Sequence, residues 1–167
     1  ETMTFQDLLY GTMLKSGNDG ANAIAVLVAG SIPAFVEKMN ARAQEIGCTG
    51  THFANAHGLH DDNHYSTAHD LALIAQTAMR NPTFRKIVGT QEYTMNISTR
   101  GAVTVSSTNS LLNPKSSFYY EECIGIKTGM HSKAGKCLVG AAEQEGVTLI
   151  TVTMHCGDDP ERYIDTT

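Results

Sequence analysis

The sequence lacks several features that would assign it to common protein classes. It has 12 lysine and arginine residues against 17 aspartate and glutamate residues, so the clustered positive charge of a nucleic-acid-binding domain is missing. No apolar run approaches the roughly 20 residues needed to cross a bilayer. Only 4 of its 167 residues are proline, and 41% are hydrophobic, which is a globular rather than a disordered composition. The length suits one globular domain.

The cysteines also lack a recognisable pattern. Cys48, Cys123, Cys137 and Cys156 include no Cys-x-x-Cys pair, so a zinc or redox motif is not expected. A disulfide between Cys123 and Cys137 is one alternative, and free thiols are the other. Spacing does not reveal whether two cysteines have the geometry of a disulfide. Free thiols are therefore favoured, since buried free cysteines are common.

Cap residues and apolar spacing predict helices in the first half of the chain. The expected helices cover residues 4–14, 21–29, 31–46, 67–79 and a short segment from 82 to 88. Thr4, Ser31 and Ser66 or Thr67 are expected N-caps, and Asn18 or Asp19 would cap the second helix. In the first helix, the residues expected to face the core are Phe5, Leu8, Leu9 and Thr12.

The second half changes to the pattern of β-strands. Short runs rich in β-branched residues predict strands at 92–97, 102–107, 124–128, 136–142 and 147–154, with 130–135 as a hairpin loop. Helices followed by strands favour an α+β fold with an antiparallel sheet. We therefore expect a single domain over residues 1–167, in which about 1–90 is mostly helical and about 91–167 mostly sheet.

Two short motifs carry chemical information. Gly125-Ile126-Lys127-Thr128-Gly129 contains a Lys-Thr-Gly triplet, and Ser16-Gly17-Asn18 is a Ser-x-Asn triplet. Both occur in penicillin-recognising serine acyltransferases, together with a Ser-x-x-Lys motif that supplies the nucleophile. No serine in this sequence has a lysine three residues later. Either triplet alone is more often an ordinary turn.

Further blocks extend this pattern in order along the chain. They comprise residues 7–11, 16–23, 35–43, 51–55, 57–61, 64–72, 108–112, 125–129 and 132–135. With these blocks, the sequence resembles the D-alanyl-D-alanine carboxypeptidases, the low-molecular-weight penicillin-binding proteins of serine peptidase type, over essentially its whole length.

The resemblance implies a β-lactamase/transpeptidase-like α+β fold, in which an antiparallel sheet is flanked by helices beside a helical subdomain. It also implies truncation at the N-terminus, with the nucleophilic serine upstream of Glu1, so that this chain alone is inactive. The intact enzyme is expected to remove the terminal D-alanine from peptidoglycan stem peptides outside the bacterial cytoplasm. It would be acylated by β-lactams and would need no cofactor, and any membrane association would come from segments outside this chain.

The resemblance also assigns roles to individual residues. Ser16, Asn18 and Lys127 are the expected catalytic residues, and Lys127, Thr128 and Gly129 the expected substrate-binding residues. Ser16 would shuttle a proton, and Asn18 would contact the substrate peptide group.

One position departs from the family pattern. Thr108 stands where some members have an arginine that assists with the substrate carboxylate. Anion binding would then rest more on Lys127, Thr128 and a group that the sequence does not identify.

Three other interpretations remain. The stretch from His57 to His64 has the composition of a metal site, but Gly58 and the run Asp61-Asp62-Asn63 favour a loop, and no metal site is expected. A serine β-lactamase would share the fold and both triplets. A non-catalytic module that binds peptidoglycan peptides would also fit a chain without a nucleophile.

Overall fold

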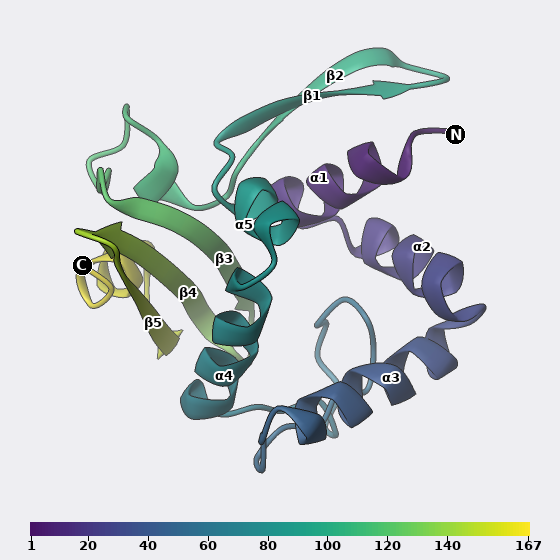
Figure 1. The fold of residues 1–167 in the computed structure, drawn as a ribbon, viewed down its shortest axis with the longest axis horizontal. Helices are drawn as coiled ribbons and strands as arrows, with labels where there is room; N and C mark the ends of the chain where they lie inside the picture. Colours follow the sequence, from purple (N-terminus) through teal and green to yellow (C-terminus); the bar gives the residue numbers. More distant parts are fainter.

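The computed structural model describes all residues from 1 to 167, and Figure 1 shows the order of the elements. The helices are α1 (Phe5–Lys15), α2 (Asn18–Ala29), α3 (Ile32–Glu45), α4 (Ala68–Met79), α5 (Pro82–Val88) and α6 (Asp159–Ile164), with a 3-10 turn η1 (Ser110–Leu112). The strands are β1 (Glu92–Ile97), β2 (Gly101–Ser106), β3 (Cys123–His131), β4 (Gly135–Gln144) and β5 (Val147–Cys156).

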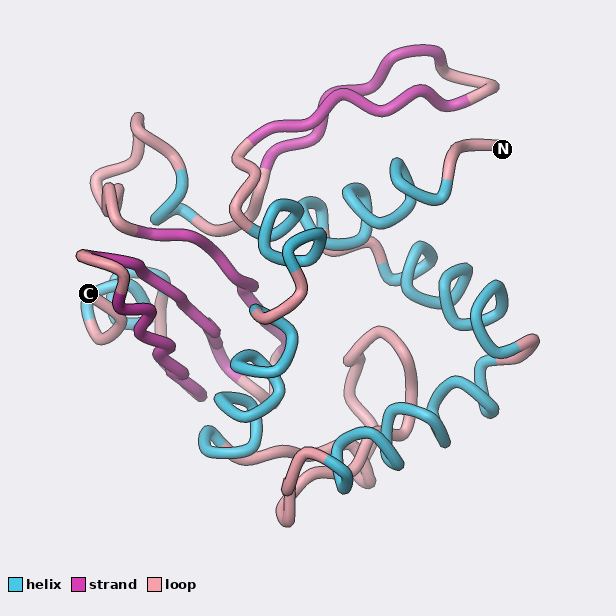
Figure 2. The backbone as a smooth tube through the Cα atoms, in the orientation of Figure 1, coloured by secondary structure: helices cyan, strands magenta, loops and turns pink.

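The strands form two antiparallel sheets, which Figure 2 shows as separate magenta units. β1 pairs with β2, and the second sheet has the order β3-β4-β5. Ala75 of α4 and Val88 of α5 pack with Ala141 on one face of the second sheet. Tyr163 of α6 packs with Leu138 on the other. Because side chains alternate along β4, the strand packs against helices on both faces of the sheet. The expected antiparallel sheet flanked by helices is confirmed.

Three of the predicted helix starts are confirmed. Thr4, Ser31 and Thr67 each accept a hydrogen bond from the backbone amide three residues later, which satisfies an amide that has no partner within the helix. The prediction for α2 is wrong. Its N-cap is Gly17, because the chain reverses direction at Ser16 and the helix begins earlier than its apolar run.

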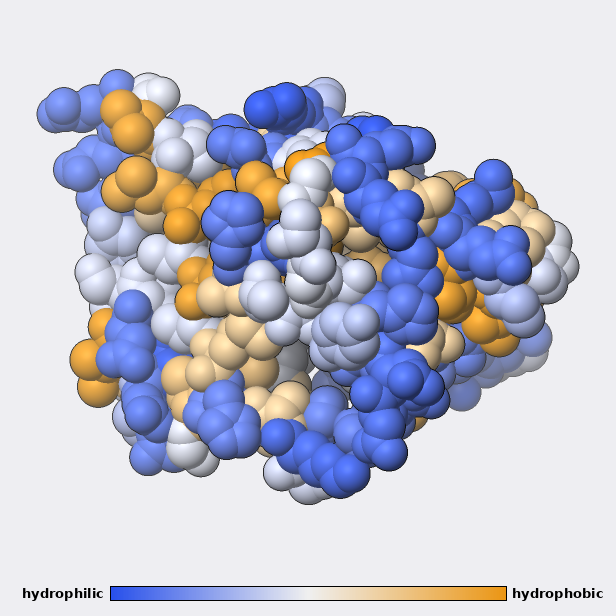
Figure 3. Space-filling view, turned by 90° about the horizontal axis from the view of Figure 1, so that it is seen from below, coloured by the Kyte–Doolittle hydropathy of each residue, from blue (hydrophilic) through white to orange (hydrophobic).

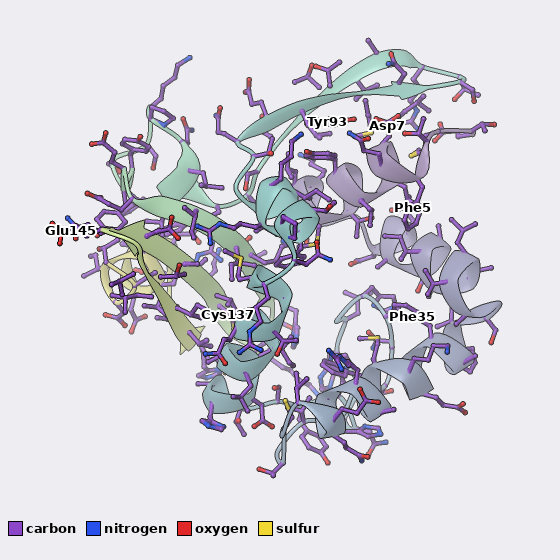
Figure 4. The ribbon with its side chains drawn as sticks, in the orientation of Figure 1. Phe5, Asp7, Phe35, Tyr93, Cys137 and Glu145 are labelled. Carbon is purple, nitrogen blue, oxygen red and sulfur yellow. The ribbon has the colours of Figure 1, made fainter.

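The predicted core face of α1 is partly wrong. Phe5 is 50% exposed, whereas Asp7, Tyr10 and Leu14 are buried. The reason lies in β1, far along the sequence. The Tyr93 hydroxyl donates to the Asp7 carboxylate at 2.8 Å, and its ring stacks on Tyr10, so this polar face of the helix turns inward. Figure 4 shows Asp7 and Tyr93 close together between α1 and the β1–β2 hairpin.

All five predicted strands form; β1 has the predicted bounds, β2 is shifted by one residue, and β3, β4 and β5 are longer than predicted. β3 extends to His131 and β5 to Cys156, so the loop between β3 and β4 shrinks to residues 132–134. Residues 130 and 131 were expected in that loop, but they pair with Lys136 and Gly135. Pairing with β4 thus overrides the local signal of the glycine and polar residues.

The polar segment 48–66 is largely a loop, as predicted, with one isolated bridge between His52 and Tyr65. Asp70, which is 1% exposed, holds this loop on α4 by accepting from the Gly50 amide at 2.8 Å and the Thr51 hydroxyl at 2.7 Å. The hydrogen bond from Thr51 is the main cause that lowers the pKa of Asp70.

The surface mixes charged and apolar regions. Figure 3 shows orange hydrophobic patches among blue hydrophilic residues on the face seen from below. The exposed apolar side chains include Val26, Leu27 and Val28 of α2. No single helix is long and apolar enough to span a membrane, although α2 and α3 together pass that test by length and composition across an 85° bend. All four cysteines are free, so the Cys123–Cys137 disulfide is not formed.

Candidate active site

Lys127, Thr128 and Gly129 lie on β3, which is an edge strand with β4 as its only partner. α5 covers the beginning of this strand: a Cβ atom added at Gly125 would lie 2.9 Å from Val88 Cγ2 and 3.1 Å from its carbonyl oxygen. Further along, Gly129 is exposed and Met130 is 67% exposed. An extended ligand can therefore add to β3 only along its second half.

Ser16 lies in the tight connection between α1 and α2, and Asn18 is the first residue of α2. Ser16 adopts a left-handed conformation with φ 62° and ψ 45°, which is costly for a residue other than glycine and is often found at functional sites. Gly20 fixes the turn from the other side, because a Cβ there would lie 2.3 Å from Thr12 Oγ1. The side chains of Ser16 and Asn18 are exposed.

Thr108 connects this turn with β3. Its backbone amide donates to the Leu14 carbonyl at 3.2 Å, two residues before Ser16. Its hydroxyl lies 2.6 Å from the Thr128 hydroxyl. The loop after β2 thus joins the end of α1, two residues before Ser16, to Thr128 of the Lys-Thr-Gly segment.

Lys127 is the most perturbed cation of the site. Burial, and then the positive charge of Arg162, lowers its pKa from 10.5 to about 8. The ammonium donates to the carbonyl of Thr128 at 2.9 Å. Burial removes water from the Lys127 ammonium, and no carboxylate forms an ion pair with it. An anion that approaches Lys127 therefore stabilises its charged form.

Arg162 is the cation that the sequence did not reveal. It is 7% exposed, pairs with Asp159 at 2.7 Å and donates to the Gly129 and Cys137 carbonyls at 3.4 Å each. It also donates to the Tyr163 hydroxyl at 3.2 Å. The only signal in the sequence is Pro160, a residue type common in the first turn of a helix, and it places no side chain against β3. Arg162 is a candidate for the unidentified group expected to help with anion binding.

The histidine-rich stretch uses two of its rings as hydrogen-bond acceptors within the loop. No group of three or more His, Cys, Asp or Glu side chains is placed to hold a metal ion. His57 and His64 instead accept hydrogen bonds from the backbone amides of Leu59 and Ala54. Burial is the main cause that lowers the pKa of His64. These rings shape the loop, and their nitrogens are used within it.

Comparison with known proteins identifies the family. A family model described as D-alanyl-D-alanine carboxypeptidase matches residues 1–157. The chain belongs to the D-alanyl-D-alanine carboxypeptidase family. It is 33% identical over 167 residues to D-alanyl-D-alanine carboxypeptidase DacF of Bacillus subtilis (strain 168), covering 100% of this chain and 42% of that protein. It is 37% identical over 178 residues to the D-alanyl-D-alanine carboxypeptidase of Streptomyces sp. (strain K15), covering 100% of this chain and 60% of that protein.

Solved structures agree with the family assignment. The crystal structure of the Streptomyces K15 DD-transpeptidase superposes with a TM-score of 0.86 at 37% identity, covering 96% of this chain and 63% of that chain. The transpeptidase-like fold expected from the resemblance is therefore confirmed. The chain spans less than two thirds of the length of these relatives.

Proposed function

We propose that the protein containing this chain is a serine-type D-Ala-D-Ala carboxypeptidase that removes the terminal D-alanine from peptidoglycan stem peptides. The proposal rests on one observation: Thr108 links the end of α1, beside Ser16, to Thr128 on the free edge of β3. We propose that the Ser-x-Asn turn, which begins two residues after Leu14, serves the same edge of β3, to which a peptide can add. We treat residues 1–167 as part of one transpeptidase-like domain.

The edge suits a peptide that ends in a carboxylate. Lys127 supplies a buried positive charge whose pKa of about 8 leaves it mostly protonated at neutral pH. Thr128 supplies a hydroxyl beside it, held by Thr108. Arg162 adds a second cation that contacts the carbonyl of Gly129. Charge-assisted hydrogen bonds from such groups are stronger than neutral ones. Lys127 and Thr128 would therefore bind the terminal carboxylate of the substrate, and Arg162 would add positive charge nearby.

The turn between α1 and α2 supplies the complementary groups. The exposed Asn18 amide can both donate to and accept from a substrate peptide group. The exposed Ser16 hydroxyl can carry a proton to the departing D-alanine. Gly129 has no side chain, so the substrate backbone can approach β3 closely there. These are the roles that we propose for the residues of the turn and of the strand.

Acylation requires a nucleophile in addition to these groups. The family uses the serine of a Ser-x-x-Lys motif, which residues 1–167 do not contain, so the proposed reaction needs that motif from elsewhere in the protein. With it, the serine would attack the peptide carbonyl while its neighbouring lysine accepts the proton. The C–N bond would then break, protonated D-alanine would leave, and the acyl-enzyme formed in this step would be hydrolysed by water to release the shortened peptide and restore the serine. No step calls for a metal or an organic cofactor.

The partners and the place of action follow from this reaction. The proposed ligands are stem peptides ending in D-Ala-D-Ala and the β-lactams that acylate the same serine. Peptidoglycan lies outside the bacterial cytoplasm, so we propose an extracytoplasmic protein.

The test is the rate of acylation by benzylpenicillin, followed by intact mass on the protein that contains this chain. Lys127→Ala is expected to lower the second-order rate at least tenfold, about 1.4 kcal/mol of barrier. Lys38→Ala, which removes an exposed lysine of α3, is the matched control and should leave the rate unchanged. An unchanged rate in Lys127→Ala would overturn the assignment of this residue.

The same experiment separates two other activities. Rapid turnover of penicillin would indicate a serine β-lactamase instead. Absence of any adduct, together with retained binding of stem peptides, would indicate a non-catalytic peptidoglycan-binding module.

A further inference from the structure

The tip of the β3–β4 hairpin meets the histidine-rich loop from the helical half of the chain. Lys133 Nζ lies 2.8 Å from His60 Nε2, although 73 residues separate them. The rings of His60 and His131 lie 5.7 Å apart. Because an ammonium group only donates, the His60 nitrogen that faces it is the acceptor. A lysine and two imidazoles from two chain segments therefore gather just beyond the exposed end of β3.

The hydrogen bonds of His131 determine which nitrogen faces outward as a donor. Its Nδ1 accepts from the backbone amides of Lys133 and Ala134, at 3.2 Å each. The proton of the neutral ring must then be on Nε2, which becomes a donor. Lys133 is 66% exposed and uses one of its three N–H groups on His60. The cluster thus presents several unused donors and a positive charge.

An anion already occupies part of this position. Asp62 Oδ1 lies 3.1 Å from His60 Nε2 and 3.8 Å from Lys133 Nζ. Because His60 Nε2 accepts from Lys133, the ion-pair partner of Asp62 is Lys133. The Asp62 side chain is 90% exposed, so this ion pair is weak and solvent-screened. A carboxylate from a ligand can replace it at little cost, because Asp62 then returns to water.

The distance along β3 connects this cluster with the proposed active site. A strand advances about 3.3 Å per residue. When the terminal carboxylate of an extended peptide lies at Thr128, its third residue from the C-terminus lies about 7–10 Å further, beside Met130 and His131. The opposite direction is blocked where α5 packs on Gly125. The side chain of the residue before the two D-alanines thus comes within reach of Lys133.

We propose that Lys133, with His60 and His131, forms a subsite that recognises a carboxylate on the side chain of the residue preceding D-Ala-D-Ala. This inference rests on the proposed function, since it uses the peptide position assigned there. It adds a specificity: a side-chain carboxylate is preferred over the corresponding amide or over an amine. Lys133 supplies the charge, and His60 and His131 supply position and a further hydrogen bond.

The test uses three peptides that differ only in this side chain. Acetyl-X-D-Ala-D-Ala is prepared with X as 2-aminoadipate, its side-chain amide, or lysine. Binding to the protein that contains this chain is measured by NMR titration, with the nucleophilic serine replaced by alanine in every protein compared so that the peptides are not cleaved. We expect the carboxylate peptide to bind at least about fivefold more tightly than the amide, with shifts of the His60 and His131 ring signals. This preference should weaken as salt is raised, because exposed charges are screened.

Variants identify the group responsible. Lys133→Ala should reduce the preference to less than about twofold, Lys133→Arg should retain most of it by keeping the charge, and Lys38→Ala should not change it. Equal affinity for the carboxylate and amide peptides in the wild type, or an unchanged preference in Lys133→Ala, would overturn the subsite. So would the absence of binding by all three peptides.

The acylation assay keeps this inference separate from the proposed function. If the wild-type protein is acylated but shows no preference among the peptides, only the subsite is wrong. If the peptides show the expected preference but no acylation occurs, the proposed function is wrong and the carboxylate site stands.

Discussion

The hydroxyl groups of Thr108 and Thr128 lie 2.6 Å apart, and this contact ties the loop after β2 to the strand that carries the Lys-Thr-Gly residues. Thr108 is also held by the Leu14 carbonyl through its amide and by the Tyr163 hydroxyl through its carbonyl oxygen, at 3.2 and 3.3 Å. One residue therefore contacts α1, β3 and α6. The candidate site depends on this junction for the position of its substrate-binding hydroxyl.

Thr108→Val should weaken the site without disturbing its shape. Valine fills nearly the same volume but leaves the Thr128 hydroxyl without this partner. A hydrogen bond of this kind is worth about 1 kcal/mol, so we expect acylation by benzylpenicillin to slow about fivefold in a stopped-flow or mass assay. Thr108→Ser keeps the hydroxyl that contacts Thr128, so its acylation rate should remain within about twofold of the wild-type rate. Equal rates in all three proteins would show that Thr128 needs no support.

Arg162 should contribute to the alkaline limit of activity through Lys127. Burial, and then the charge of Arg162, lowers the pKa of Lys127 to about 8, so anion binding and the acylation rate should fall as pH rises through about 8. Removing the positive charge in Arg162→Gln makes protonation of Lys127 easier, and the alkaline limb should move to higher pH. The measurement is the pH profile of the acylation rate.

The conservative variant distinguishes charge from structure. Arg162→Lys keeps the positive charge, so its alkaline limb should stay close to that of the wild type even where the absolute rate falls. A limb that does not move in Arg162→Gln would mean that burial alone perturbs Lys127.

Ser16 should show opposite requirements for stability and function. Its left-handed conformation costs about 1–2 kcal/mol for a residue with a Cβ atom, and glycine avoids this cost. Ser16→Gly should therefore be more stable than Ser16→Ala by about 1 kcal/mol in urea unfolding. Both variants lose the hydroxyl, so both should lose the proposed proton transfer and lower D-alanine release. Retained release in Ser16→Gly would contradict the catalytic role.

Asp70 should stabilise the loop of residues 48–66 in a pH-dependent manner. Its hydrogen bonds from Thr51 and Gly50 lower its pKa below 3.8, so its contribution is present above pH 3.8 and is lost as pH falls through the folded-state pKa. Asp70→Asn should lower the melting temperature at neutral pH and speed amide exchange in the loop. The difference from the wild type should shrink in acid.

Asp19→Asn is the matched control for that experiment. Asp19 also lies in the first turn of a helix but is exposed, so its replacement should change the melting temperature little at any pH. A difference between wild type and Asp70→Asn that persists at the lowest pH would contradict the role of the ionised carboxylate.

The sequence was informative where a local rule decides the structure. The N-caps at Thr4, Ser31 and Thr67 were predicted because each side chain serves an amide three residues away. The Ser-x-Asn and Lys-Thr-Gly triplets pointed to the family because further blocks typical of the family occur in order along the chain. The sequence misplaced Phe5, since the buried face of α1 depends on Tyr93 in a strand formed 86 residues beyond Asp7.

The sequence by itself determined all five strands, most of the helices, which family the chain resembles and which residues could serve as catalytic groups, because these depend on residue type and short spacing. Only the tertiary structure decided that Thr108 joins α1 to Thr128, that Arg162 lies near Lys127 and that His60 reaches Lys133. These relationships join residues that are distant along the chain. Their proximity follows from the packing of α1, α6 and the polar loop around β3, which no local pattern records.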